Sequence, residues 1–180
     1  MRANRFNRPL TVVLGDLDLL RNINNNYGHL AGDVVLCGIA EILQKKFRDY
    51  DIAVRFGGEE FAILLPETTT EQAFPRVEVI RETIESTSFI VSTSVTPIKV
   101  TISFGIAERN GYSQSPTDII HNADVALYSA KMGGRNETRI YTDKGIDSLF
   151  GIDSKYKSIF ETQPHESRLE ENGYHLQTKS

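Results

Sequence analysis

The chain has 180 residues, which is enough for one well-buried domain with extensions but too few for two ordinary domains. Its formal net charge of −4 gives no broad basic field and argues against duplex nucleic acid as a partner. No apolar run approaches the length of a membrane span, and a single cysteine, Cys37, excludes an intrachain disulfide. We therefore expect a cytoplasmic protein in which Cys37 is a small buried residue of a helix.

The N-terminal third begins with a polar, basic lead-in, residues 1–9, followed by an apolar run at 10–14 that predicts a strand. This strand ends in Gly15-Asp16-Leu17-Asp18, so that carboxylates emerge at its end. After a short asparagine-rich segment, apolar residues at helical spacing predict a helix over 30–47.

Two short apolar runs, 52–54 and 61–65, flank Gly57-Gly58-Glu59-Glu60 and predict a hairpin with its acids at the turn. By itself this pattern is typical of an ordinary hairpin with solvated glutamates. If the strand at 10–14 lies beside the hairpin, however, Asp16 and Glu59 converge. Two carboxylates at one sheet edge suit a hard divalent cation such as Mg²⁺.

In the second half of the chain, Thr68 and Glu71 match a capping box that opens a helix, and Pro75 is expected to shift or kink its first turn. Runs rich in β-branched residues at 89–94 and 100–107 predict two strands joined by a turn.

A last helix is expected to start at Ser115-Pro116 and to stop at Gly133-Gly134, before a strand at 140–141. From residue 143 to 180 the composition predicts a polar, mobile tail. The order of elements indicates an α+β fold with helices covering one or both faces of a sheet.

Several motifs occur together over residues 8–142 and resemble, in order and spacing, the GGDEF family of diguanylate cyclases. They are Asp16-Leu17-Asp18, Asn24-Asn25-Asn26-Tyr27-Gly28-His29, Gly32-Asp33-Val34-Val35-Leu36, Arg55-Phe56-Gly57-Gly58-Glu59-Glu60-Phe61, Ala123-Asp124-Val125-Ala126-Leu127-Tyr128-Ser129-Ala130-Lys131 and Gly134-Arg135-Asn136. The resemblance implies a palm-like, ferredoxin-related sheet flanked by helices and a GGDEF domain over 10–142. The family's usual N-terminal Asp-x-Leu-Thr-Gly-Leu-x-Asn-Arg segment has no match, so we expect a domain that begins late, with any sensory or dimerising domain outside this chain.

The resemblance implies condensation of two GTP molecules into cyclic di-GMP and two pyrophosphates, with two Mg²⁺ or Mn²⁺ ions per half-site. Asp16, Glu59 and the backbone carbonyl of Leu17 would bind the metals. Glu60 would be a metal neighbour or a proton acceptor. The pair Gly57-Gly58 would let the backbone approach the phosphates without side chains in the way.

For the base, Asn24 and Asp33 match family positions that hydrogen-bond guanine. A carboxylate that accepts from N1–H and the 2-amino group selects guanine over adenine. Asp33 could instead stabilise the first turns of its helix. Leu19 and Leu20 would line the purine pocket, or equally belong to the core.

For the triphosphate, Lys131 and Arg135 match phosphate contacts of the family and would lie one turn apart on the last helix, if it extends that far. Their alternative role is to compensate the C-terminal helix dipole. Arg21 stands where the family usually has lysine, which keeps the charge but alters its geometry.

Arg48 and Asp51 resemble the family's product-inhibition motif, in which an arginine fork and a carboxylate bind cyclic di-GMP. A second arginine would come from Arg76 or Arg81. The alternative is a surface salt bridge at a helix end.

Two further functions remain open. A catalytically silent module could sense GTP or cyclic di-GMP, and a cyclase could make a mixed guanine-adenine product, although Asp33 argues against the latter. With one guanine pocket and one Gly-Gly-Glu-Glu turn per chain, a cyclase would need a transient antiparallel homodimer to build its two-fold symmetric product.

Overall fold

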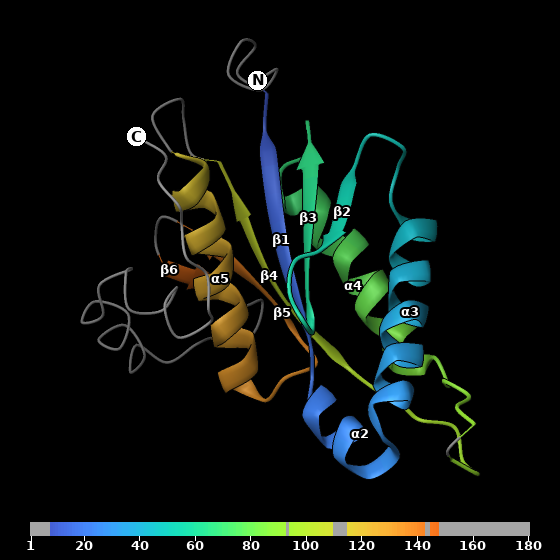
Figure 1. Ribbon diagram of the computed structural model, residues 1–180. Helices are drawn as coiled ribbons and strands as arrows, with labels where there is room; N and C mark the ends of the chain where they lie inside the picture. Colours follow the sequence, from blue (N-terminus) through green and yellow to red (C-terminus); the bar gives the residue numbers. More distant parts are fainter. Residues whose placement is uncertain (1–7, 93, 110–114, 143–144, 148–180) are drawn as a thin grey trace, which may run out of the picture. The chain divides into compact units, whose positions relative to one another are not determined.

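The computed structural model describes residues 8–92, 94–109, 115–142 and 145–147 (Figure 1). Most of the predicted lead-in and most of the predicted tail lie outside these residues. In chain order the elements are β1 (Leu10–Leu17), α2 (Leu20–Tyr27), α3 (His29–Lys46), β2 (Ile52–Arg55), β3 (Glu60–Pro66), α4 (Thr70–Ser86), β4 (Ile102–Glu108), α5 (Pro116–Gly133), β5 (Thr138–Thr142) and β6 (Gly145–Asp147).

A mixed six-stranded sheet forms the centre of the fold, with the strand order β2-β3-β1-β4-β5-β6. The strand β1 lies between β3 and β4 and runs antiparallel to both, whereas β4 and β5 are parallel. Because β1 is paired on both edges and buried on both faces, seven of its eight residues are buried. The predicted α+β architecture is confirmed, and the end of β1 is held in the middle of the sheet.

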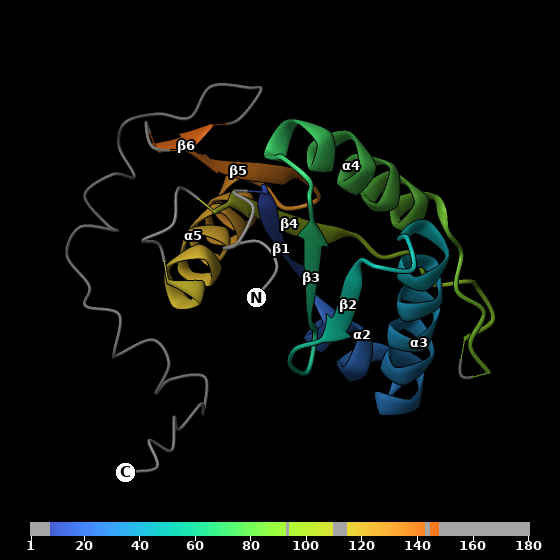
Figure 2. The same cartoon turned by 90° about the horizontal axis from the view of Figure 1, so that it is seen from above.

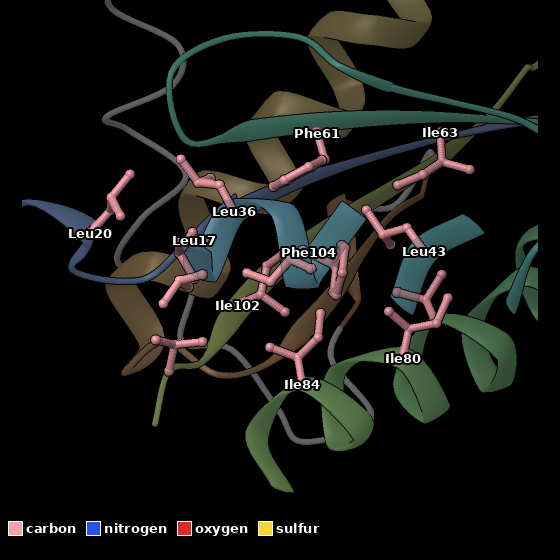
Figure 3. Packing of buried hydrophobic residues seen from close by; sticks show 14 of the residues in the cluster. Leu17, Leu20, Leu36, Leu43, Phe61, Ile63, Ile80, Ile84, Ile102 and Phe104 are labelled. Carbon is pink, nitrogen blue, oxygen red and sulfur yellow. The ribbon is translucent and has the colours of Figure 1, made fainter. Parts of the chain in front are cut away.

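Helices cover the two faces of this sheet unequally (Figure 2). On one face α3 and α4 pack over a large core, to which β3 contributes the side chains of Phe61 and Ile63 (Figure 3). Leu65, two residues further along β3, belongs to the same core. On the other face α5 packs on β1, β4 and β5 over a smaller cluster that includes Val12 and Leu14. The period of two along the strands thus fills both cores from the same sheet.

A glycine on β4 sets how closely α5 approaches the sheet. A Cβ atom at Gly105 would lie 2.1 Å from the carbonyl oxygen of Ala123 and 2.2 Å from the amide nitrogen of Leu127. Both are backbone atoms and cannot rotate away. Gly105 therefore allows backbone contact between α5 and β4. This contact sets the distance from the sheet at which α5, the helix that carries Lys131, packs.

The residues predicted to cap α4 were wrong by one position. The capping box of α4 uses Thr69 and Gln72 rather than Thr68 and Glu71, because Thr68 is buried and its carbonyl accepts from the hydroxyl of Thr11. The helix α4 begins at Thr70, directly after its cap, and Pro75 lies inside it.

Cys37 is exposed, contrary to the prediction. The buried stripe of α3 is formed by Val35, Leu36, Ile39 and Leu43, and position 37 falls outside it.

The strand predicted at 89–94 was also wrong. Only an isolated bridge joins Phe89 to Ile98, and β4 begins at Ile102. Phe89, Val91 and Ile98 are nevertheless buried in the larger core. The β-branched composition of this segment thus reflects packing of its side chains and not a strand ladder.

No helix in the described part of the chain combines the length and the apolar character that crossing a membrane requires.

The contact at Gly105 yields a stability prediction. Gly105→Ala should lower the free energy of unfolding by about 1–3 kcal/mol or more, because overpacking against backbone forces α5 away from β4. Gly58→Ala is the matched control, since a Cβ there would meet nothing within 4 Å. Urea denaturation measures both variants, and equal stability of the two would contradict this account of the close contact.

Candidate active site

The acids predicted to converge lie at the end of β1 and at the turn between β2 and β3. Asp16 is aligned with Glu60 in the β1–β3 ladder, and the amide of Leu17 donates to the carbonyl of Glu59 at 3.0 Å. The structure therefore brings Asp16, Glu59 and Glu60 to the same edge. This proximity depends on the antiparallel register, which places the start of β3 beside the end of β1.

Asp16 is a buried carboxylate with a single close cation. Its side chain is only 5% exposed, and its Oδ2 lies 2.6 Å from Nζ of Lys131 on α5. Burial raises the pKa of Asp16 above its ordinary value, and the hydrogen bond and charge of Lys131 only partly oppose this shift. Burial also raises the pKa of Glu59, with the negative charge of Asp16 as the next cause. Added positive charge would favour the ionised form of both groups.

The donors at this edge fit a hard divalent cation. Carboxylates of Asp16 and Glu59 and the carbonyl of Leu17 are oxygen ligands, which Mg²⁺ and Mn²⁺ accept. Among the described residues no group of three or more His, Cys, Asp and Glu side chains could hold a metal. Bound ions would therefore need oxygens from water and substrate phosphates to complete their coordination, as is usual for Mg²⁺ at nucleotide sites.

The glycine turn is closed by its own backbone and by an arginine. The amides of Phe56 and Gly57 donate to the carbonyl of Glu60 at 2.8 and 3.3 Å. The guanidinium of Arg55 donates to the carbonyls of Gly57 and Gly58 at 3.2 and 2.6 Å. No role was predicted for Arg55, although an arginine two residues before the Gly-Gly pair was a usable signal in the sequence.

The fold does not require glycine at position 58 of the turn. Positive φ among glycines of the described chain occurs at Gly28 and Gly134, not at Gly57 or Gly58. A Cβ at Gly58 would also meet open space. The glycine therefore leaves bare backbone on the outside of the turn, where a ligand could approach it.

The two predicted base-binding residues lie on consecutive helices joined by one residue. Gly28, at φ 86°, ends α2 and begins α3. Asn24 lies against the start of α3, because a Cβ at Gly32 would be 2.1 Å from Asn24 Oδ1. That oxygen is buried and has no hydrogen-bond partner among the described residues. Asp33, next in sequence to Gly32, is exposed, and the first turn of α3 contains no acid, which weakens the helix-dipole alternative.

The neighbouring residues of α2 fall into two groups. Leu20 is 5% exposed and belongs to the larger core, which favours the core alternative for it. Leu19 is 56% exposed and has φ 60°, and Arg21 is exposed in the first turn of α2. Contact of Leu19 or Arg21 with a nucleotide stays a prediction.

The last helix stops at Gly133-Gly134, as predicted, so it does not extend to Arg135. The helix α5 ends at Gly133, Gly134 has φ 136°, and Arg135 follows in the left-handed region at φ 68°. The Gly133-Gly134 pair ends the helix before Arg135 can join it. The charge of Arg135, like that of Lys131, opposes the rise in the pKa of Asp16 that burial causes, so both expected phosphate contacts act on the same carboxylate.

Asp18 was missed as a functional candidate. Its buried carboxylate accepts from Thr101 Oγ1 and Ser103 Oγ, both at 2.8 Å, and from the amide of Asn136 at 3.1 Å. The signal available in the sequence was its spacing of two from Asp16, which in extended chain directs both side chains to the same side, although β1 itself ends at Leu17. Its role is to join three segments and not to offer free oxygens.

A second cluster of charged residues lies between α3 and β2, at the predicted inhibitory motif. Asp51, whose side chain is fully buried, accepts from the amide of Arg48 at 2.9 Å and from the guanidinium of Arg76 on α4. The guanidinium of Arg48 donates to the hydroxyl of Tyr50 at 2.6 Å, so a salt bridge between Arg48 and Asp51 is not what closes this loop. Asp51 Oδ1 and Arg76 Nη1 are buried without partners among the described residues.

Of the two candidates for a second arginine, the structure places Arg76 at this cluster. Arg81 instead pairs with Glu78 and Glu85 on its own helix and donates to Asn136.

Comparison with known proteins agrees with the fold and with the motifs. A sequence profile described as "Diguanylate cyclase, GGDEF domain" matches residues 1–137. The chain belongs to the GGDEF family. Diguanylate cyclase A of Treponema denticola is 39% identical over 131 residues, which cover 73% of this chain and 35% of that protein. Diguanylate cyclase DgcM of Escherichia coli is 40% identical over 126 residues, which cover 70% of this chain and 29% of that protein.

Solved GGDEF structures confirm the palm-like fold. The active GGEEF domain of a Vibrio cholerae diguanylate cyclase matches with a TM-score of 0.72 and 34% identity, over 79% of this chain and 88% of that one. The GGDEF domain of DgcB from Caulobacter crescentus, in complex with c-di-GMP, matches with a TM-score of 0.74 and 28% identity, over 77% and 81%. This GGDEF chain spans only about a third of the length of the curated relatives.

The raised pKa of Glu59 yields a prediction for the metal-free domain. Glu59→Gln should raise the Tm at pH 7 by about 1–3 °C, because folding disfavours the ionised carboxyl. With a folded-state pKa above the ordinary 4.5, the advantage of the variant should grow as pH rises above that value and disappear below it. Thermal melts in EDTA from about pH 4 to pH 8 measure this difference.

Glu71→Gln is the control with the opposite sign. Hydrogen bonds of Thr69 at the start of α4 lower the pKa of Glu71, so its neutralisation should lower the Tm slightly at pH 7. A fall in Tm for Glu59→Gln at pH 7 would contradict the electrostatic account.

Proposed function

We propose that this chain is the catalytic domain of a diguanylate cyclase that condenses two GTP molecules into cyclic di-GMP and two pyrophosphates. The observation that carries the proposal is the pairing of Asp16 and Glu59 at the sheet edge, with Lys131 and Arg135 acting on the same charge. Two close acids, of which Asp16 is buried and Glu59 half-buried, support an enzyme over a silent binding module, which would not need them. GTP is an intracellular nucleotide, so the cytoplasm is the proposed site of action.

The proposed chemistry is in-line attack of one ribose 3′-hydroxyl on the α-phosphate of the other GTP. Bound Mg²⁺ or Mn²⁺ would stabilise charge on the attacking and leaving oxygens, with Asp16, Glu59 and the carbonyl of Leu17 as ligands. Glu60, adjacent to the pair, is the candidate proton acceptor. Lys131 would pass from Asp16 to phosphate as cations arrive, which keeps the buried carboxylate compensated throughout.

Base selection would come from Asn24 and Asp33. The unpartnered Oδ1 of Asn24 and the exposed carboxylate of Asp33 can both accept hydrogen bonds, and guanine offers N1–H and its 2-amino group as donors. Adenine lacks this pair of donors, which supports a product with two guanines over a mixed one.

Two copies of the domain would have to meet, because one chain carries one such site and the product is two-fold symmetric. Each copy would present its bound GTP to the other across the glycine turns in an antiparallel arrangement. The open backbone at Gly58 supports this geometry, since the close approach of two nucleotides leaves little room for side chains.

The direct test of the acid pair is Glu59→Gln. We expect cyclic di-GMP synthesis to fall by at least about a hundredfold, because the variant loses a charge that the metals require. Product formation from GTP and Mg²⁺ is followed by chromatography, with Glu71→Gln as a control that should remain active. Turnover by Glu59→Gln at the wild-type rate would contradict the role of Glu59 as a metal ligand.

We further propose that cyclic di-GMP inhibits the enzyme at Arg48, Asp51 and Arg76. The support is the exposed guanidinium of Arg48 beside two buried polar atoms that lack partners, on Asp51 and Arg76. Arginine forks suit the phosphates and guanine edges of such a ligand.

Arg48→Ala should therefore raise the cyclic di-GMP concentration needed for half-inhibition by about tenfold or more, with the initial rate on GTP largely unchanged. Calorimetry with cyclic di-GMP provides the affinity. Equal affinity of variant and wild type would show that this cluster is not the inhibitory site.

A further inference from the structure

The turn that follows α5 carries two consecutive non-glycine residues in the left-handed region. Arg135 has φ 68° and Asn136 has φ 51°. Side chains rarely adopt this conformation unless neighbouring structure holds them in it. The amide of Arg135 donates to the carbonyl of Ala130 at 3.1 Å, which anchors only the first of the two residues.

The backbone amide of Asn136 is held by Asp18, the residue that follows β1, and by Ser103 on β4. Its amide lies 3.1 Å from Asp18 Oδ2 and 3.1 Å from Ser103 Oγ. Asp18 is 6% exposed, and Thr101 also donates to its Oδ2 while Ser103 donates to its Oδ1. A buried, charged acceptor of this kind binds an amide strongly and leaves it little freedom to shift.

The side chain of Asn136 is anchored from the other direction, by α4. Its Oδ1 accepts from Arg81 Nη1 at 2.8 Å, and its Nδ2 donates to Glu85 Oε1 at 2.8 Å. Arg81 is itself fixed by Glu78 and Glu85. Asparagine suits this position twice, because it tolerates the left-handed conformation and offers both a donor and an acceptor.

We infer that Asn136 and Asp18 are positioning residues that aim the Arg135 guanidinium at the substrate triphosphate. Neither residue needs to touch the nucleotide. Arg135 is exposed, and the backbone from which its side chain extends is held at both Arg135 and Asn136, which limits the region that the guanidinium can reach. The inference rests on the proposed function, in which Arg135 binds phosphate.

The first test is a double-mutant cycle on nucleotide binding, read by calorimetry in the presence of Mg²⁺. The probe is a GTP analogue with a methylene group between its α- and β-phosphates, which cannot release pyrophosphate. Arg135→Ala should weaken binding by about tenfold to a hundredfold, and Asn136→Ala by much of the same factor. The double variant should bind no more weakly than Arg135→Ala alone, because Asn136 acts through Arg135.

Guanosine, which lacks phosphates, distinguishes a loss of phosphate binding from disruption of the whole nucleotide site. Its affinity, measured by NMR titration, should be unchanged in Asn136→Ala and in Arg135→Ala. Asn136→Gly is the matched variant that keeps the left-handed backbone and its amide but loses the contacts to α4. Its affinity for the analogue should fall between those of wild type and Asn136→Ala.

The second test needs no nucleotide. Amide hydrogen exchange should show a protected Asn136 amide in the wild type and faster exchange in Asp18→Asn, at temperatures where melting curves show both proteins folded. Additive losses in the cycle, an equal loss of guanosine affinity or an unprotected Asn136 amide would each overturn the positioning role. Failure of the wild type to bind the analogue would instead overturn the proposed function, and this inference with it.

Discussion

The end of β1 is the constraint on which the rest of this structure depends. Three consecutive residues there each hold a different segment: Asp16 pairs with α5, the amide of Leu17 binds the turn between β2 and β3, and Asp18 binds the turn after α5. Because β1 is the central strand and is paired on both edges, its end cannot move independently of the sheet. Segments that are far apart in sequence are thereby brought to one edge with defined spacing.

Burial makes the ionised form of the carboxylates at this edge unfavourable. The environment raises the pKa of both Asp16 and Glu59, and a single close ion pair with Lys131 only partly compensates the buried charge. A fold optimised for stability alone would not place two acids here. A site that receives divalent cations and a triphosphate needs them, since incoming positive charge restores the balance and the rigid sheet avoids reorganisation. This cost in stability is the physical reason to regard the edge as functional.

The sequence alone predicted the features that local chemistry determines. Hydrophobic periodicity predicted the strands around the hairpin and the three long helices, and clustered motifs predicted which acids would meet. Errors arose where distant contacts decide. The segment at 89–94 packs its apolar residues without forming a strand. The turn that carries Arg135 is held by Asp18, more than a hundred residues earlier, and this contact was not predicted. The stripe that exposes Cys37 depends on which face of α3 meets the sheet.

The most direct measurement of the central claim is the rate of cyclic di-GMP formation per molecule across a wide dilution series, with sedimentation recording the oligomeric state. One chain presents one acid pair, so the account predicts a rate that rises with protein concentration, and rises strongly when a dimeric coiled coil is fused to the N-terminus. Specific activity that stays constant across the series, with monomer alone in sedimentation, would contradict a site assembled from two domains.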